Sequence, residues 1–561
     1  MTRKIVRTLS QVAAAAIFTF TVLFFLDRNL DVLPNAIHEY MPQHHVGTVI
    51  TDITIVTCNS MNPFSSCKAD AEWTRINKDL FLGKSLLTSG YIHFQKKKEE
   101  DIAQGDKVVV DVKVGRLDPS ANGDGADPHE EWEQRPSGLW VKLSSKKHAS
   151  DSEKAVTMVD VLFGEDAVEV REGWSLVGTA LLIDSSIQAH FTVRRGAHKE
   201  PPKPQPRVRD DKKFRILQVS DLHLSTGIGH CRDAVPDEYN GGKCEADPRT
   251  LDFVNKVLDE ERPDLVVLSG DQVNGDTAPD AQSAIFKYAS LLISRKIPYV
   301  SIFGNHDDEG TSARAAQMRL IEKLPYSLSQ AGNPDLPGVG NYYIEVLAPG
   351  SSKHSAITIY LLDSHSYSPD EKHYPGYDWI KPSQIEWFKE TSISLHEHHK
   401  EYTFHHINTA FIHIPLPETV IDPQYRVGAV REGVTAPSFN SGFRDALVER
   451  NVAFVGYGHD HANEYCALST DNSTGVPHTS RPELWMCYAG GSGFGGYGNY
   501  DGFIRGMRVW DFEMNIGRVK TWKRHEYGER TEERINEQTI VDGARLVGAP
   551  EPKPPPSADA I

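Results

Sequence analysis

Five apolar, strand-like segments in the second half of the chain each end in a polar cluster that contains His, Asp or Asn. These clusters are Asp221-Leu222-His223, Gly270-Asp271, Gly304-Asn305-His306-Asp307, His413 and Gly458-His459-Asp460-His461. Burying five such clusters costs free energy unless something compensates the desolvated charge. Carboxylate, imidazole and amide side chains bind Zn, Fe or Mn, so the pattern predicts a two-metal site rather than five unrelated turns.

The segments between these clusters alternate between strand and helix patterns. The stretch "LDFVNKVLDEE" places Leu251, Val254 and Leu258 at helical spacing, and it lies between the strand-like "RILQVSD" and "PDLVVLSGD". Strands that alternate with helices predict an α/β fold with a largely buried sheet. Ligands of such folds bind at the carboxyl ends of the strands, which is where the polar clusters stand.

The order D-x-H, GD-x-x-x-G, GNH[DE], a lone His and GH-x-H resembles the calcineurin-like metallophosphoesterase superfamily over residues 214–525. The stretches "SDLHLS", "FGNHDDE" and "GHDHANEYC" are similar to fungal and plant phosphatases related to purple acid phosphatases, in particular a fungal type described as a dosage-dependent cell-cycle regulator. The resemblance implies a four-layer α/β/β/α sandwich.

The resemblance also implies a role for each residue of the clusters. Asp221, His223 and His461 would hold a first ion, and Asn305, His413 and His459 would hold a second, with Asp271 bridging the two. His306 would face the phosphate and the leaving group, and Asp307 would orient its ring. Two divalent or trivalent ions (Mn, Zn or Fe) would activate water. Asn274 stands where purple acid phosphatases carry a tyrosinate ligand, so iron is not specifically implied.

These residues predict a phosphatase that hydrolyses phosphate monoesters, with phosphoproteins as the expected substrates. A phosphodiesterase or pyrophosphatase acting on nucleotides or lipid head groups is the alternative within the same fold. A membrane-tethered, non-catalytic binding protein is the alternative from another class. The formal net charge of −17 argues against a nucleic-acid partner.

The N-terminus carries an apolar run behind basic residues. Val12 to Leu26 is uncharged, and with Leu9 to Gln11 it approaches the length that spans a bilayer. No small-residue cleavage site follows, so an uncleaved signal-anchor helix over residues 9–26 is preferred to a cleaved signal peptide or a buried helix. Arg3, Lys4 and Arg7 then predict a single-pass membrane protein of the secretory pathway (endoplasmic reticulum, vacuole or cell surface) with a lumenal catalytic domain.

Composition divides the chain further. We expect a cytosolic stub and anchor over 1–30, a stalk and β-rich, sandwich-like domain over 31–195, a Pro- and charge-rich linker over 196–213, the metallophosphoesterase domain over 214–525, and a mostly disordered tail over 526–561. The 6 Cys fall into three local pairs, typical of disulfides, although their connectivity stays open. Asn472 begins a sequon that is compatible with glycosylation.

Three further stretches are ambiguous. Asp363, Ser364 and His365 either line the pocket or form an ordinary strand-end turn. The His-rich tract 396–406 is interpreted as a solvated surface, and the Gly-rich stretch 488–502 as a flexible loop over the rim of the site.

Overall fold

The computed structural model describes residues 3–30, 47–59, 67–122 except 69, 84, 86 and 104, and then 127–146, 149–399, 404–419, 426–470, 482–500 and 502–548. The chain forms two compact units. One contains Met1–Leu162 and Gly173–Glu200, and the other contains Phe163–Glu172 and Pro201–Ile561. The sequon at Asn472 lies outside the described residues.

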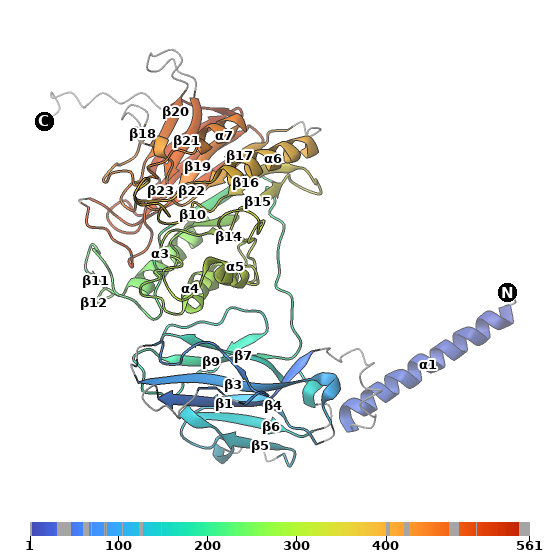
Figure 1. Ribbon diagram of the computed structural model, residues 1–561. Helices are drawn as coiled ribbons and strands as arrows, with labels where there is room; N and C mark the ends of the chain where they lie inside the picture. The colour runs from blue at the N-terminus through green and yellow to red at the C-terminus, as the bar shows by residue number, and fades with distance from the viewer. Residues whose placement is uncertain are drawn as a thin grey trace. The chain divides into compact units, whose positions relative to one another are not determined.

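The first unit is rich in strands, which confirms the predicted β-rich region (Figure 1). Its three sheets have the orders β1-β3-β2, β4-β6-β5 and β7-β9-β8. Alternating apolar residues such as Val49, Val108 and Val110 are buried in its core. The strands are β1 (Thr48–Asn59), β2 (Thr74–Arg75), β3 (Thr88–Lys98), β4 (Val108–Val114), β5 (Glu130–Gln134), β6 (Leu139–Ser144), β7 (Val156–Phe163), β8 (Trp174–Leu176) and β9 (Ala189–Arg195).

Helix α1 (Arg3–Leu30) contains the apolar run for which a membrane span was predicted. Within the part of the chain that the structure describes, no helix combines the length and the apolar character needed to cross a bilayer. The predicted transmembrane helix is therefore not supported.

The second unit contains two seven-stranded sheets. The first has the order β14-β13-β10-β22-β23-β24-β25, and the second has the order β15-β16-β17-β19-β21-β20-β18. In the first sheet these strands are β10 (Lys213–Val219), β13 (Leu265–Ser269), β14 (Tyr299–Ile302), β22 (Gly506–Glu513), β23 (Arg518–His525), β24 (Ile535–Asp542) and β25 (Arg545–Leu546). In the second they are β15 (Tyr342–Leu347), β16 (Ser355–Leu361), β17 (Ile407–Phe411), β18 (Arg426–Val427), β19 (Val452–Tyr457), β20 (Cys466–Thr470) and β21 (Pro482–Tyr488).

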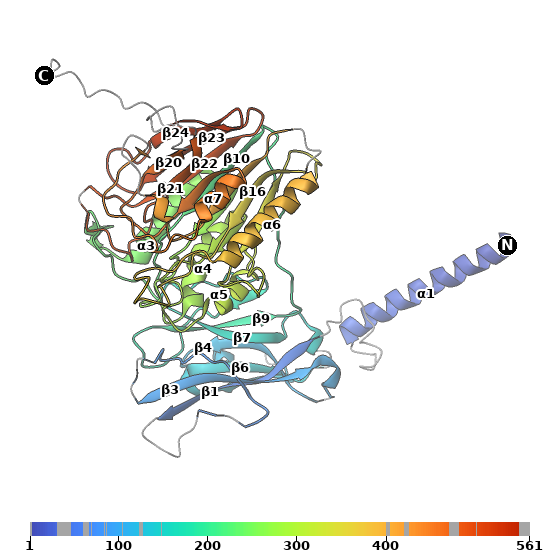
Figure 2. The same cartoon turned by 45° about the horizontal axis from the view of Figure 1, so that its top comes forward.

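The two large sheets pack face to face around one apolar core. Phe454 of the second sheet stacks on Trp510 of the first, with ring centroids 3.7 Å apart and an interplanar angle of 7°. Helices cover the outer faces. Glu261 at the end of α3 (Ala246–Glu261) accepts a hydrogen bond from Trp522 of β23. Phe388 of α6 (Pro382–His399) packs in a second cluster with Phe443 of α7 (Phe443–Glu449) and Val455 of β19. Figure 2 shows α6 and α7 side by side over the second sheet.

The remaining elements are short or peripheral. The helices are α3 (Ala246–Glu261), α4 (Ala281–Ser294), α5 (Arg314–Ile321), α6 (Pro382–His399) and α7 (Phe443–Glu449). A two-stranded sheet is formed by β11 (Glu238–Tyr239) and β12 (Gly242–Lys243), and the 3-10 turns are η1 (Glu99–Asp101), η2 (Pro119–Asn122), η3 (Pro136–Gly138), η4 (Ala149–Asp151) and η5 (Pro417–Thr419). Disulfides join Cys58 to Cys67, Cys231 to Cys244 and Cys466 to Cys487, the three local pairs noted in the sequence.

Two segments predicted to be solvated or disordered are part of the second unit. Strands β24 and β25 lie within residues 526–561 and extend the first sheet, because Ile540 and Val541 enter its core. In the predicted linker, Val208 is buried and donates its backbone N–H to the carbonyl of Leu347 on β15. Burial of a few apolar side chains at the sheet therefore stabilises these segments in a folded state, although their composition is mainly polar.

Candidate metal centre

The predicted ligands stand just beyond the ends of five parallel strands. Strands β10, β13 and β14 run parallel in the first sheet, and β17 and β19 run parallel in the second. Their carboxyl ends are followed by Asp221, Asp271, Asn305, His413 and His459, respectively. Because parallel strands end at the same edge of a sheet, the two sheets bring all five turns together.

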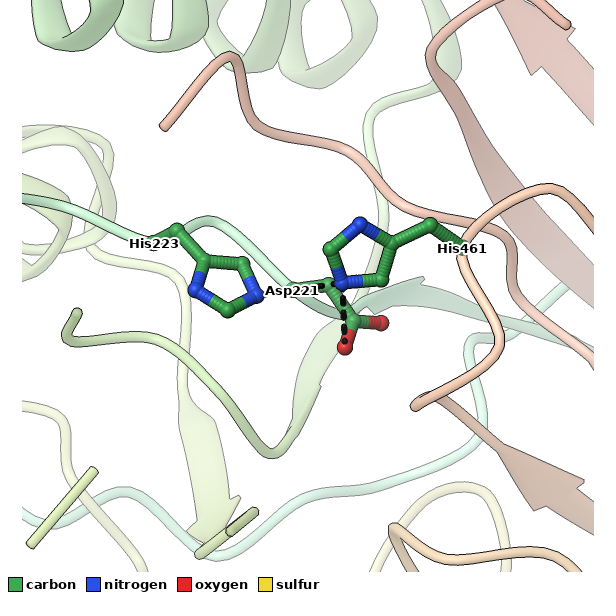
Figure 3. A group of neighbouring side chains, drawn as sticks. All are labelled: Asp221, His223 and His461. Atoms are coloured by element: carbon green, nitrogen blue, oxygen red, sulfur yellow. Dashed lines mark hydrogen bonds and ion pairs between the residues drawn. The ribbon is translucent and has the colours of Figure 1, made fainter. Parts of the chain in front are cut away.

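The first group of ligands consists of Asp221, His223 and His461. One ligand atom from each lies within 4.8 Å of the others, and all three side chains are buried. The Nε2 atoms of His223 and His461 are 3.1 Å apart, and the Nε2 of His461 is 3.5 Å from Asp221 Oδ1. Figure 3 shows the two imidazole rings and the carboxylate converging on one small volume.

The second group consists of Asp271, His413 and His459, again with ligand atoms within 4.8 Å of one another. The Nε2 of His413 lies 3.1 Å from Asp271 Oδ2. Asn305 lies beside this group, because its neighbour His306 donates a backbone N–H to Asp271 Oδ1 over 2.8 Å.

Asp271 faces both groups. Its Oδ2 atom is 3.1 Å from the Nε2 of His413 in the second group and 3.8 Å from the Nε2 of His223 in the first. A carboxylate between two sets of ligands is what a bridging ligand requires.

Hydrogen bonds orient two of the imidazole rings. The Nδ1 of His461 lies 3.0 Å from the carbonyl of Tyr497, and the Nδ1 of His413 lies 2.9 Å from the carbonyl of Ser269. Each carbonyl fixes a proton on Nδ1, so Nε2 is the ring atom that faces the site.

Burial disfavours the charged ring of His413, but the Asp271 carboxylate outweighs it and raises the pKa of His413 to about 9, so a cation would displace the proton on its Nε2. Burial lowers the pKa of His223 and of His459 to about 3, so both rings are neutral, as metal ligation requires.

The side chains present fit a pair of metal ions. Both amide atoms of Asn305 and the Nε2 of His459 are buried and have no hydrogen-bond partner, a costly arrangement that a cation would relieve. Four ligands also have backbone in the left-handed region, with φ of 56° at Asp221, 48° at His223, 53° at Asp271 and 76° at His459. Backbone strain of this kind is typical of functional sites.

Asp307 does not orient His306, contrary to the expectation from sequence. Its carboxylate accepts hydrogen bonds from the backbone N–H groups of Gly304, Asp271 and Val273, at 2.7, 2.9 and 2.9 Å. Three of the roughly four lone-pair sites of the carboxylate are thus engaged by the backbone, and Asp307 holds the two ligand-bearing turns together.

The partner of His306 is Glu309. The Nδ1 of His306 lies 2.6 Å from Glu309 Oε2. Burial disfavours the charged ring, but the nearby Asp271 carboxylate and the hydrogen bond that the ring donates to Glu309 outweigh it and raise the pKa of His306. The His306 side chain is 34% exposed, whereas the ligands around it are buried, so it stands on the open side of the site.

The Gly-rich stretch 488–502 packs directly against the ligands instead of forming a flexible rim. A Cβ atom at Gly496 would lie 2.4 Å from His461 Cε1, and one at Gly493 would lie 1.9 Å from the carbonyl of Leu222, so only glycine fits at either position. Tyr497 within this loop stacks on His461, with ring centroids 3.9 Å apart and an interplanar angle of 8°. The glycines are the one sequence signal that could have indicated this close approach, but they do not show which segment is approached.

The remaining candidates are structural. Asp363 accepts hydrogen bonds from Arg314 and from the backbone of His365, and Ser364 accepts one from the backbone of Ile414. These contacts favour the strand-end turn over a lining of the pocket. In the His-rich tract, His399 is buried against Glu345 and lines a separate cavity of about 880 Å³ beside α6 and α7.

Comparisons with known proteins identify the family. Residues 214–463 match the model of the calcineurin-like phosphoesterase family. The chain is 36% identical to phosphatase DCR2 of Saccharomyces cerevisiae, over 69% of this chain and 67% of that protein. It is 29% identical to an uncharacterized protein of Schizosaccharomyces pombe (94% and 96%) and 37% identical to probable inactive purple acid phosphatase 14 of Arabidopsis thaliana (57% and 82%). The family model, the relatives and the two ligand groups at the strand ends all point to one family. The chain belongs to the calcineurin-like phosphoesterase family.

Proposed function

We propose that the protein is a dinuclear metal-dependent phosphatase that hydrolyses phosphate monoesters, with phosphorylated proteins as its substrates. The observation that supports this most is the combination of two buried ligand groups, facing a common carboxylate in Asp271, with a partly exposed imidazole in His306. Buried ligands hold ions, whereas an acid that exchanges protons with a substrate must be reached from solvent.

The chain's own residues account for the proton transfer. The two ions, when bound, supply Lewis-acid activation of water and of the phosphoryl oxygens. His306 donates its proton to the ester oxygen as the bond from phosphorus to that oxygen breaks, which releases the alcohol. Water supplies the oxygen of the new bond to phosphorus; one of its protons stays on the inorganic phosphate, the other passes to solvent, and His306 regains a proton from solvent. Glu309 stabilises the protonated ring of His306 before the proton is transferred. The products of the reaction are a free alcohol and inorganic phosphate.

A phosphodiesterase is the nearest alternative, because a diester would use the same ligands and the same acid. The name of the yeast relative, a phosphatase, favours the monoester. A non-catalytic role is the second alternative, since an Arabidopsis relative is named as inactive. The solvent-accessible His306–Glu309 pair beside complete ligand groups favours catalysis over that role.

The deciding experiment compares phenyl phosphate with diphenyl phosphate, with Mn, Zn and Fe supplied in turn to the full chain. We expect monoester turnover to dominate and to vanish in Asp271→Asn. Dominant diester turnover would move the function to diesters with the same ligands. Less than one bound metal equivalent after supplementation, together with no turnover, would favour the non-catalytic role.

We further propose that the protein folds in an oxidising, lumenal compartment. The three disulfides support this, because such bonds persist in oxidising environments and are rare in the cytosol. Thiol labelling of the denatured protein from cells, with and without reductant, tests it: labelling of all six cysteines without reductant would contradict the proposal.

A further inference from the structure

A tight loop over residues 365–378 borders the metal centre and carries two facing tyrosines. Tyr367 and Tyr377 form an antiparallel β-bridge, flanked by backbone hydrogen bonds of 2.9 Å from Ser368 to Gly376 and from Asp378 to Ser366. Directly opposed residues on such a ladder share one face. Their rings accordingly stack, with centroids 5.5 Å apart and an interplanar angle of 22°.

The inner edge of this aromatic pair touches the second ligand group. The ring of Tyr377 meets that of His459 edge to face, with centroids 4.3 Å apart and an interplanar angle of 89°. The hydroxyl of Ser366 donates a hydrogen bond of 3.2 Å to the carbonyl of Asn305. Two contacts therefore fix the position of the tyrosine pair relative to the metal ligands: the hydrogen bond from Ser366 and the ring contact of Tyr377.

The outer edge of the pair lies on the open side of the site. The side chain of Tyr367 is 50% exposed, and its hydroxyl donates a hydrogen bond of 3.4 Å to Glu309 Oε1. The other oxygen of Glu309 contacts His306, the proposed acid for the leaving group. A single carboxylate, that of Glu309, therefore links the exposed ring of Tyr367 to the proposed acid.

Holding the loop in place does not account for Tyr367. The base of the loop is already packed by Trp379, whose ring lies 4.7 Å from that of Phe439 and 4.0 Å from the ammonium group of Lys381. A ring that remains half exposed contributes little buried area to folding, and its exposed surface is available to a ligand.

We propose that Tyr367 and Tyr377 form a binding surface for an aromatic leaving group, so that the preferred substrates are phosphate monoesters of aromatic alcohols, including phosphotyrosine. This rests on the proposed phosphatase function and specifies its substrate class. An aromatic ring that stacks on Tyr367 brings its ester oxygen to His306, which donates the proton as the bond from phosphorus to oxygen breaks. An alkyl ester has no flat face with which to make this contact.

The test measures kcat/KM for phenyl phosphate and for propyl phosphate in the metal-loaded full chain. Because phenoxide is intrinsically the better leaving group, the informative quantity is the phenyl-to-propyl ratio of each variant divided by that of the wild type. We expect this ratio to fall about fivefold in Tyr367→Leu. It should stay near the wild-type value in Tyr367→Phe, which keeps the ring.

Tyr527→Leu is the matched control, since Tyr527 is 47% exposed and is not part of the loop; its ratio should not change. An unchanged ratio in Tyr367→Leu, or an equal loss for both esters, would overturn the proposed aromatic surface while leaving the phosphatase intact. Absence of monoester turnover in the wild type would instead overturn the proposed function on which it rests.

Discussion

The carboxylate of Glu309 lies 2.6 Å from the Nδ1 of His306, three residues earlier in the chain. This contact places the carboxylate that supports the proposed acid in the same turn as the acid itself. The turn 304–309 therefore contains one candidate ligand, one candidate acid and the group that stabilises its proton.

Replacing Glu309 by Gln should lower kcat/KM by roughly 10- to 100-fold, because the protonated ring loses its anionic partner. The loss should be larger for propyl phosphate than for phenyl phosphate, since the poorer leaving group depends more on the proton. Glu533→Gln is the control, because Glu533 forms an exposed ion pair with Arg530 at the same three-residue spacing. An equal loss for both esters would indicate a purely structural role for Glu309.

Replacing Asp307 by Ala should destabilise the protein by about 3 kcal/mol, because three backbone N–H groups would lose their acceptor in a buried turn. Urea unfolding of the metal-free protein measures this without interference from bound ions. Asp276→Ala, an exposed carboxylate in the same loop, is the control. If the free energy of unfolding is unchanged and only turnover falls, Asp307 acts on the chemistry and not on the turns.

Replacing Tyr497 by Leu should weaken metal binding roughly 10- to 100-fold, because Tyr497 fixes the ligand His461 by ring stacking. Its hydroxyl also accepts the backbone N–H of His461 and donates to Glu432, each at 3.0 Å. Tyr497→Phe keeps the stack and should lose less affinity. Competition with a chromogenic chelator measures both variants, and equal affinity in wild type and Tyr497→Leu would refute the contribution of the ring.

Glu464 should make stability fall at acid pH. Burial opposes its ionisation, but the hydrogen bond from His525 and the charge of Lys523 outweigh it and hold the pKa of Glu464 at about 2, below the ordinary value of 4.5. A carboxyl with a lower pKa when folded stabilises the protein above about pH 4.5, and this stabilisation is lost as the pH falls towards 2.

The lowered pKa of Glu464 contributes about 3 kcal/mol to the free energy of unfolding at neutral pH. Urea unfolding of the metal-free protein between pH 6 and pH 3 should show a shallower acid slope in Glu464→Gln than in the wild type. Glu529→Gln, at an exposed position, should keep the wild-type slope. Identical slopes in wild type and Glu464→Gln would contradict the prediction.

The sequence was sufficient to predict the α/β fold and the residues that cluster at the strand ends, because a polar cluster after an apolar run is a local signal. It was not sufficient for contacts between distant segments. That Tyr497 stacks on His461 depends on how the loop after β21 folds back. His306 contacts Glu309 and not Asp307, because backbone N–H groups from two turns donate hydrogen bonds to Asp307. The sequence does not show which carboxylate these groups choose. The strand β24 was missed because the charged residues that precede it masked a short apolar pattern.

The place of β22 beside β10 has a consequence for biosynthesis. Strand β10 begins at Lys213, but its neighbour β22 begins only at Gly506, so the first sheet keeps an exposed edge until residues 506–513 have left the ribosome. The loop that presses on His223 and His461 arrives in the same late segment. A nascent chain that already contains every candidate ligand therefore still lacks this wall of the metal centre, and we expect stable metal binding only after residues 488–513 have been synthesised.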